Sequence, residues 1–159
     1  MTTDFICTII SMCIITAYLL FVSLWQGLPY SISETYYHTL SRWTFPICLV
    51  SAGAFATMPL LNHTPETYQF LAFLIIASIL FVAAAPAFKE EFEGKVHYGA
   101  AATLGLSALV WIILTTGMPW IALAITLCCG VCDRKRFIFW FEVGLLYNLY
   151  ASLLYILLK

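Results

Sequence analysis

The chain has 159 residues, of which 63% are hydrophobic and only 9% are charged. A soluble domain carries about 25% charged residues, so this composition excludes one, and the high apolar content excludes a disordered chain. The formal net charge of −1 provides no basic surface for nucleic acid. The composition therefore predicts a protein embedded in a membrane.

The charged residues divide the chain into apolar segments. Crossing the hydrocarbon takes about 20 apolar residues in a helix, and several charge-free runs reach that length. The run 96–132 would form one helix about 55 Å long, which is too long for one crossing, and Gly117-Met118-Pro119 divides it into a hairpin. We therefore predict an all-α transmembrane helical bundle, a single domain over 1–159, with six spans at 5–27, 43–61, 67–88, 97–116, 119–132 and 137–158.

Two short motifs predict helix starts between these spans. Ser31 followed by Glu34 is a capping box, which indicates a short helix that lies at the membrane surface before the second span. Thr64-Pro65-Glu66 has the pattern of a capping residue followed by a proline at the first helical position. We expect it to open the third span.

The basic residues predict the orientation. In a six-span topology, every Lys and Arg except the terminal Lys159 falls in the first, third or fifth loop. Loops rich in Lys and Arg remain in the cytoplasm, so this side is predicted to be cytoplasmic and the N-terminus to lie outside.

Glu142 is the one acidic residue inside a predicted span. It lies about 9 Å along the helix from Arg136. A carboxylate at this depth is a hypothesis for a functional site. The alternative is a structural role, in which Glu142 forms an ion pair with a loop base such as Arg42 or Lys95.

The topology places several polar residues on the same side as Glu142. Together they could line one pocket, hold an anionic headgroup, or relay protons, because histidine titrates near neutral pH. In the alternative interpretation each residue anchors its own helix at the interface. The candidate ligand-binding residues are His38, Arg42, Lys89, Lys95, His97 and Glu142.

The residues indicate no catalytic group, metal or cofactor. His63 lies on the opposite side from His38 and His97, so the topology excludes a site of three histidines. A set of His38, His97 and Glu142 stays an alternative. Cys129 and Cys132 form a C-x-x-C motif beside basic residues, which leaves a redox pair, a lipidated cysteine and simple helix-end packing open.

Three segments carry a resemblance: 29–37 (PYSISETYY), 84–86 (AAP) and 94–98 (GKVHY). They resemble small six-span membrane proteins of gut Bacteroidetes and their phages, a group to which no activity is assigned. That resemblance implies six spans and an inner-membrane location, and it transfers no catalytic residue. The span order, with His97 at the start of the fourth span, is distantly similar to the six-span superfamily of autophagy modulators and GPI-anchor remodelling factors.

We expect a protein without enzymatic activity that binds a lipid, an amphiphile or a membrane partner at its cytoplasmic-face polar cluster. Membrane lipids are the expected partners, together with a second copy of the chain or another membrane protein, and no nucleic acid. The expected location is the bacterial inner membrane. A small channel or transporter and an intramembrane hydrolase are the alternatives. For the first of these, the spans offer a thin set of polar side chains: Ser11, Thr16, Ser23, Thr103, Ser107, Asn148 and Ser152.

Overall fold

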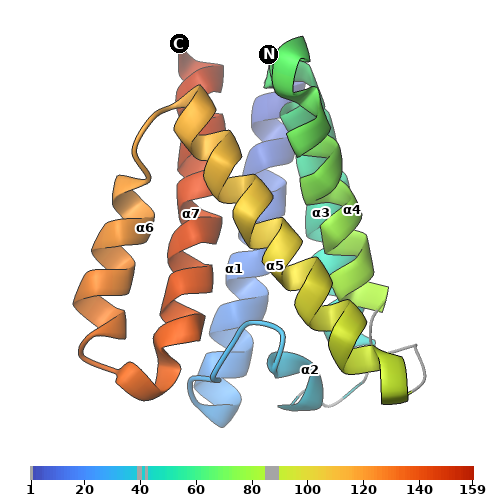
Figure 1. Ribbon diagram of the computed structural model, residues 1–159, viewed down its shortest axis with the longest axis vertical. Helices are drawn as coiled ribbons and strands as arrows, with labels where there is room; N and C mark the ends of the chain where they lie inside the picture. The colour runs from blue at the N-terminus through green and yellow to red at the C-terminus, as the bar shows by residue number, and fades with distance from the viewer. Residues whose placement is uncertain (1, 39–40, 42, 85–89) are drawn as a thin grey trace.

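The computed structural model describes residues 2–38, 41, 43–84 and 90–159, and the described part is a bundle of helices (Figure 1). The elements follow one another in a simple order along the chain. They are α1 (Thr2–Gln26), α2 (Thr35–His38), α3 (Thr44–His63), the 3-10 turn η1 (Glu66–Tyr68), α4 (Gln69–Ala84), α5 (Glu90–Thr115), α6 (Trp120–Ile125), the π-helical turn η3 (Thr126–Gly130), the 3-10 turn η4 (Arg134–Arg136) and α7 (Phe137–Leu158).

Five helical segments are long and apolar enough to cross a membrane, which confirms the all-α membrane class. They are Thr2–Gln26, Thr44–His63, Glu66–Ala84, Gly94–Thr115 and Arg134–Leu158. The segment expected at 119–132 forms the shorter apolar helix Trp120–Gly130, which would be about 16 Å long at the rise of an α-helix. A sixth crossing therefore stays a prediction.

The helices run alternately between two ends of the molecule. Both termini lie at the upper end in Figure 1, and the connection from α1 to α2 and the turn before α7 lie at the lower end. α5 and α7 both run upward, so the segment between them returns the chain to the lower end. The basic residues Arg134, Lys135 and Arg136 of η4 lie at this lower end.

The core consists of two hydrophobic clusters. The upper one joins α3, α4, α5 and α7 through side chains that are completely buried, among them Leu60, Ile75, Trp111 and Leu153. The lower one joins α1, α3, α4 and α7, and α5 contributes to it only the partly buried Ala100 and Ala101. α5 is thus bound to α7 in the upper half, and Figure 1 shows the two helices diverging toward the lower end.

Glycines in the left-handed region end two of the long helices. Gly27 has φ +84° after α1, and Gly117 has φ +93° after α5. Only glycine adopts this backbone conformation without steric cost, and it commonly follows the last helical turn. Gly117 was expected to break the run 96–132, and it does so here.

The start of α6 depends on a side chain of α7. Asn148 is buried, and its Oδ1 accepts hydrogen bonds from the backbone N–H groups of Ile121 at 3.0 Å and Ala122 at 3.2 Å. The first N–H groups of a helix have no partner within the helix, and in lipid each unpaired group costs several kcal/mol. Asn148 therefore lets α6 begin below the upper ends of α5 and α7, at the edge of the bundle (Figure 1).

Thr64 differs from its predicted role as the cap of the third span. It follows α3, and its Oγ1 donates back to the Leu60 carbonyl and accepts the Trp111 Nε1–H at 2.7 Å. Pro65, rather than Thr64, precedes η1, and it makes no side-chain cap. The Thr64 hydroxyl instead accepts the hydrogen bond of the buried Trp111 indole, because a buried Trp N–H group needs an acceptor.

Gly144 sets how closely α6 approaches α7. A Cβ atom added at Gly144 would lie 3.0 Å from the Ala122 carbonyl oxygen and 3.1 Å from the Ala122 Cα. Both atoms belong to the backbone, so no side-chain rotation would relieve the contact. At Gly99 of α5, by contrast, an added Cβ would meet nothing within 4 Å.

We predict that Gly144→Ala destabilises the bundle by about 1–3 kcal/mol, the usual cost of overpacking a close contact. The matched variant Gly99→Ala introduces the same methyl group into open space and should leave the protein as stable or slightly more so, since alanine favours helix. Thermal unfolding of both proteins in the same mild detergent measures the difference. Equal melting temperatures would contradict the close approach of α6 to α7.

Candidate functional site

The first loop, defined as residues 27–34, is bound along the beginning of α7. Three of its backbone groups form hydrogen bonds with it. The Leu28 carbonyl accepts from Arg136 Nε at 2.7 Å, the Tyr30 carbonyl accepts from the Phe139 N–H at 2.9 Å, and the Ile32 N–H donates to Glu142 Oε2 at 2.6 Å.

The position of these groups follows from elementary helix chemistry. Phe139 lies in the first turn of α7, where backbone N–H groups have no partner within the helix. Glu142 lies one turn further along, so its side chain is on the same face of α7. Alternate residues of the loop thus meet successive positions of one helix face. Glu142 therefore has a structural partner, the backbone of Ile32.

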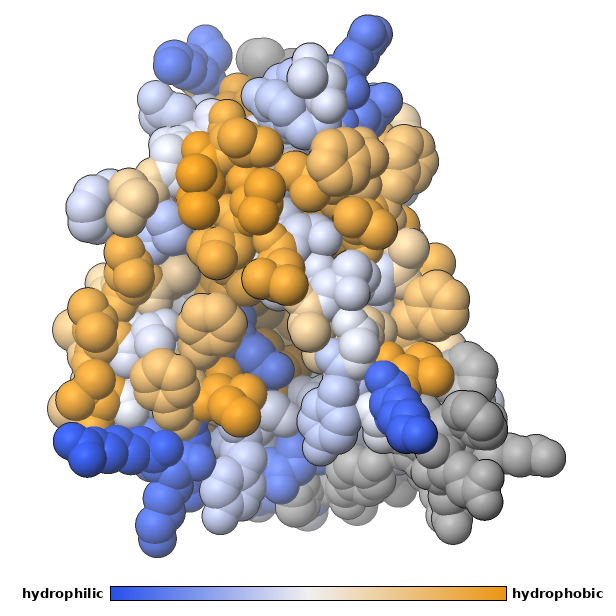
Figure 2. Space-filling model, viewed as in Figure 1, coloured by the Kyte–Doolittle hydropathy of each residue, from blue (hydrophilic) through white to orange (hydrophobic). Residues whose placement is uncertain are grey.

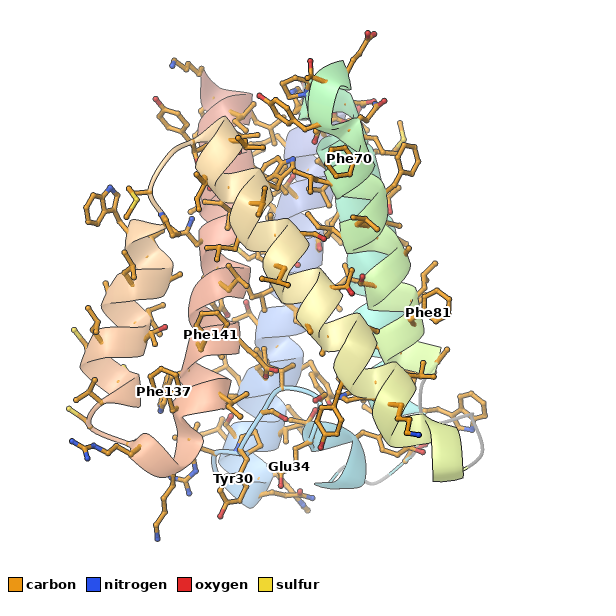
Figure 3. All side chains as sticks on the ribbon, in the orientation of Figure 1. Tyr30, Glu34, Phe70, Phe81, Phe137 and Phe141 are labelled. Atoms are coloured by element: carbon orange, nitrogen blue, oxygen red, sulfur yellow. The ribbon has the colours of Figure 1, made fainter. Side chains whose placement is uncertain are left out.

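The loop is also held by its own side chains. Ser31 Oγ accepts the Glu34 N–H at 3.1 Å, as the capping box predicts, and the Glu34 carboxylate reaches back to the Tyr30 N–H at 2.5 Å. Buried Thr35 accepts the Tyr18 hydroxyl at 2.7 Å, which ties the start of α2 to α1. Figure 3 shows Tyr30 and Glu34 together at the lower end.

The other candidate residues that the structure describes belong to a different helix from Glu142. Lys95 is exposed and His97 is partly buried with its ring 5.7 Å from that of Tyr98, and both belong to the lower part of α5. The only hydrogen bond found for the Glu142 side chain within the described residues is the one with the Ile32 backbone. His38 ends α2, where the structure describes only its backbone, and Arg42 and Lys89 lie outside the described residues.

The expected ion pair of Glu142 with a loop base is not formed within the described part of the chain. The ion pairs found there join His63 to Asp4 and Arg136 to Asp133, at 3.0 Å and 2.9 Å. Arg136 therefore contacts an acid three residues before it and the Leu28 carbonyl, and Glu142 contacts the Ile32 backbone.

A lateral cleft opens on the face shown in Figure 2. It lies between the lower parts of α5 and α7, and hydrophilic surface is visible at its floor, with hydrophobic side chains to its left and above it. Large exposed side chains on the bordering helices include Tyr98, Ile138 and Phe141, and Figure 3 places Phe141 on the front of α7. Glu142 lies at the level of this cleft, because the loop that binds it rises between the two helices (Figure 1).

A second polar cluster at the upper end was not foreseen from the sequence. Asp4 is buried with a relative exposure of 8%, and its Oδ2 lies 3.1 Å from Asn62 Nδ2 and 3.0 Å from His63 Nε2. These hydrogen bonds join the beginning of α1 to the end of α3. The only signal in the sequence that could have indicated this cluster is an acid, Asp4, and a histidine, His63, near the ends of two helices that are far apart in the chain.

The polar side chains within the spans are used between helices. Ser11 donates to the Ala52 carbonyl at 2.6 Å and lies 2.8 Å from the Tyr150 hydroxyl. Thr16 lies 2.7 Å from the Tyr147 hydroxyl, and the Ser152 hydroxyl lies 2.9 Å from that of Thr116. Hydrogen bonds of this kind join helices in lipid. These hydrogen bonds, together with those of Asn148, engage most of the polar side chains that the sequence offered for the lining of a channel.

Cysteine and metal chemistry find little support in the described part of the chain. All six cysteines are free thiols there, and Cys128 and Cys132 are exposed near the lower end of the α6–η3 segment. No group of three His, Cys, Asp or Glu side chains among the described residues is arranged to hold a metal ion. The set of His38, His97 and Glu142 includes a side chain that the structure does not describe.

No family model, no curated protein and no solved structure matches this chain. The resemblance to small six-span membrane proteins therefore stays an expectation, and the site must be argued from its own geometry.

We predict that Glu142→Ala releases the first loop, whereas Glu142→Gln retains it, because the amide oxygen can still accept the Ile32 N–H. An intramolecular hydrogen bond contributes about 0.5–1.5 kcal/mol, so exchange at Ile32 should accelerate by about two- to tenfold in the alanine variant. Hydrogen exchange with mass spectrometry on peptides spanning 27–35 measures this. An unchanged rate in Glu142→Ala would show that Arg136 and Phe139 hold the loop without it.

Proposed function

We propose that this chain is an integral membrane protein of the bacterial inner membrane. It would cross the membrane six times and bind a lipid or amphiphile from the cytoplasmic leaflet in the lateral cleft. Five long apolar helices support the membrane location. The observation that carries the binding function is the cleft itself, a hydrophilic floor that opens sideways among exposed apolar side chains (Figure 2).

The direction of the helices supports six crossings with both termini outside. α5 and α7 run the same way in Figure 1, so the chain from 116 to 136 must travel back between them, although Trp120–Gly130 is short. The basic residues of η4 lie at the end that the distribution of Lys and Arg assigns to the cytoplasm.

Reporter fusions in a bacterial host test this topology. Alkaline phosphatase fused after Lys159 should be active, because it would lie outside, and fused after Asp133 it should be inactive. Green fluorescent protein at the same two positions should give the opposite pattern. Phosphatase activity at Asp133 would mean that the segment 116–132 does not cross, which would leave five spans.

Binding from the side of the membrane is also supported by the polar floor of the cleft (Figure 2). In lipid, hydrogen-bonding groups cost free energy unless a polar group meets them. An amphiphile meets both requirements, since its headgroup enters the cleft while its chain stays in the bilayer. A membrane protein partner or a second copy of the chain would have to insert a polar side chain at the same place.

We predict that the protein extracted in mild detergent retains a lipid or amphiphile and that Ala102→Trp displaces it. Ala102 is exposed on α5, on the same face as Tyr98 and Gly105, so the indole would fill the cleft wall. Ala77→Trp is the matched control, because Ala77 is exposed on α4 beside a different stretch of lipid. Native mass spectrometry reads the occupancy. Wild-type protein that retains nothing would overturn the proposed function.

A further inference from the structure

One oxygen of the Glu142 carboxylate is not used by the loop. Oε2 accepts the Ile32 N–H, while Oε1 forms no hydrogen bond with the described residues and is not among the buried side-chain atoms that lack a partner. The carboxylate is therefore docked through one oxygen and accessible through the other. The docking partner is a neutral N–H group, so it brings no positive charge to the carboxyl group.

The described bases near the lower end do not supply that positive charge. Arg136 is engaged by Asp133 and by the Leu28 carbonyl. Lys95 is exposed on α5, and the ion pairs of the described residues do not join it to Glu142. A charge about 9 Å inside the charged edge of a span is costly unless it is paired. The cleft thus presents an acceptor that a cation would complement.

We propose that the lateral cleft selects a single-chain amphiphile with an ammonium headgroup, which donates to Glu142 Oε1. This inference rests on the proposed function and names its ligand class. The sequence also allowed an anionic headgroup. Such a headgroup would lie beside the Glu142 carboxyl group, which no described base contacts. A neutral headgroup would leave the charge unpaired.

The shape of the cleft favours a compact headgroup over a large one. α5 approaches α7 at Gly105, where an added Cβ would lie 3.9 Å from Leu145 Cδ2. Leu145 is less than one helical turn above Glu142 on α7, so α5 and α7 meet again close above Glu142. A headgroup that contacts Oε1 has to be small, and its alkyl chain would lie over the hydrophobic surface seen in Figure 2. An amine attached directly to its chain fits this path.

Three amphiphiles that share one chain and differ in the headgroup test the proposal: dodecylammonium, dodecanol and dodecanoate. We would measure their binding to the purified protein by native mass spectrometry in a non-ionic detergent at neutral pH. Dodecylammonium should bind at least about tenfold more tightly than dodecanol, and dodecanoate should bind most weakly. Glu142→Gln should abolish the preference for the ammonium while keeping the loop in place. Glu66→Gln, an exposed acid of η1 at the other end of the molecule, should keep it.

The result separates the two proposals. If dodecanoate or dodecanol binds as tightly as dodecylammonium, the ammonium class is wrong while the amphiphile site stands. If the preference for dodecylammonium survives in Glu142→Gln, the donation to Glu142 Oε1 is wrong. If none of the three binds to the wild-type protein, the proposed function fails with it. The headgroup comparison needs no variant, so it remains decisive even if Glu142→Gln does not fold.

Discussion

The constraint on which this structure depends is that backbone polar groups in hydrocarbon must find partners within the protein. Long helices meet it by themselves, and two of the places where the helical pattern is interrupted find partners on another element. The N-terminus of α6 receives the Asn148 side chain, and the first loop receives Arg136, Phe139 and Glu142. In both cases the partner belongs to α7 or to the turn before it. α7 is therefore the element around which the irregular parts of the chain are organised.

Hydrogen bonds between helices engage most of the polar side chains inside the bundle. Ser11, Thr16, Ser152 and Asn148 join helices to one another, so little polar surface is left over for an ion pathway. Glu142 is different, because its backbone partner engages one carboxyl oxygen and leaves the other without a partner among the described residues. The divergence of α5 from α7 then opens the cleft beside it. Binding from the side follows more directly from this geometry than transport through the middle.

The depth of Glu142 could be predicted from its place in the sequence, but its partner could not. Every non-proline residue carries a backbone N–H, so nothing in the sequence marks Ile32 as the one that would meet it from 110 residues away. The same holds for Asn148, which was assigned to a possible pore lining before the structure showed it at the start of α6. The capping box at Ser31 was predictable because both of its partners lie within four residues.

The sequence by itself determined the helical membrane class, the approximate limits of the long helices and the end that carries the basic turn Arg134–Arg136. These depend on apolar length, local breakers and charge, which are properties of contiguous residues. Only the tertiary structure decided that the start of α6 is capped by Asn148, that α6 packs tightly at Gly144 and that the lower part of α5 diverges from α7. The reason is that the distance between two helices is set by the side chains on both facing surfaces together, and these come from segments far apart in the chain.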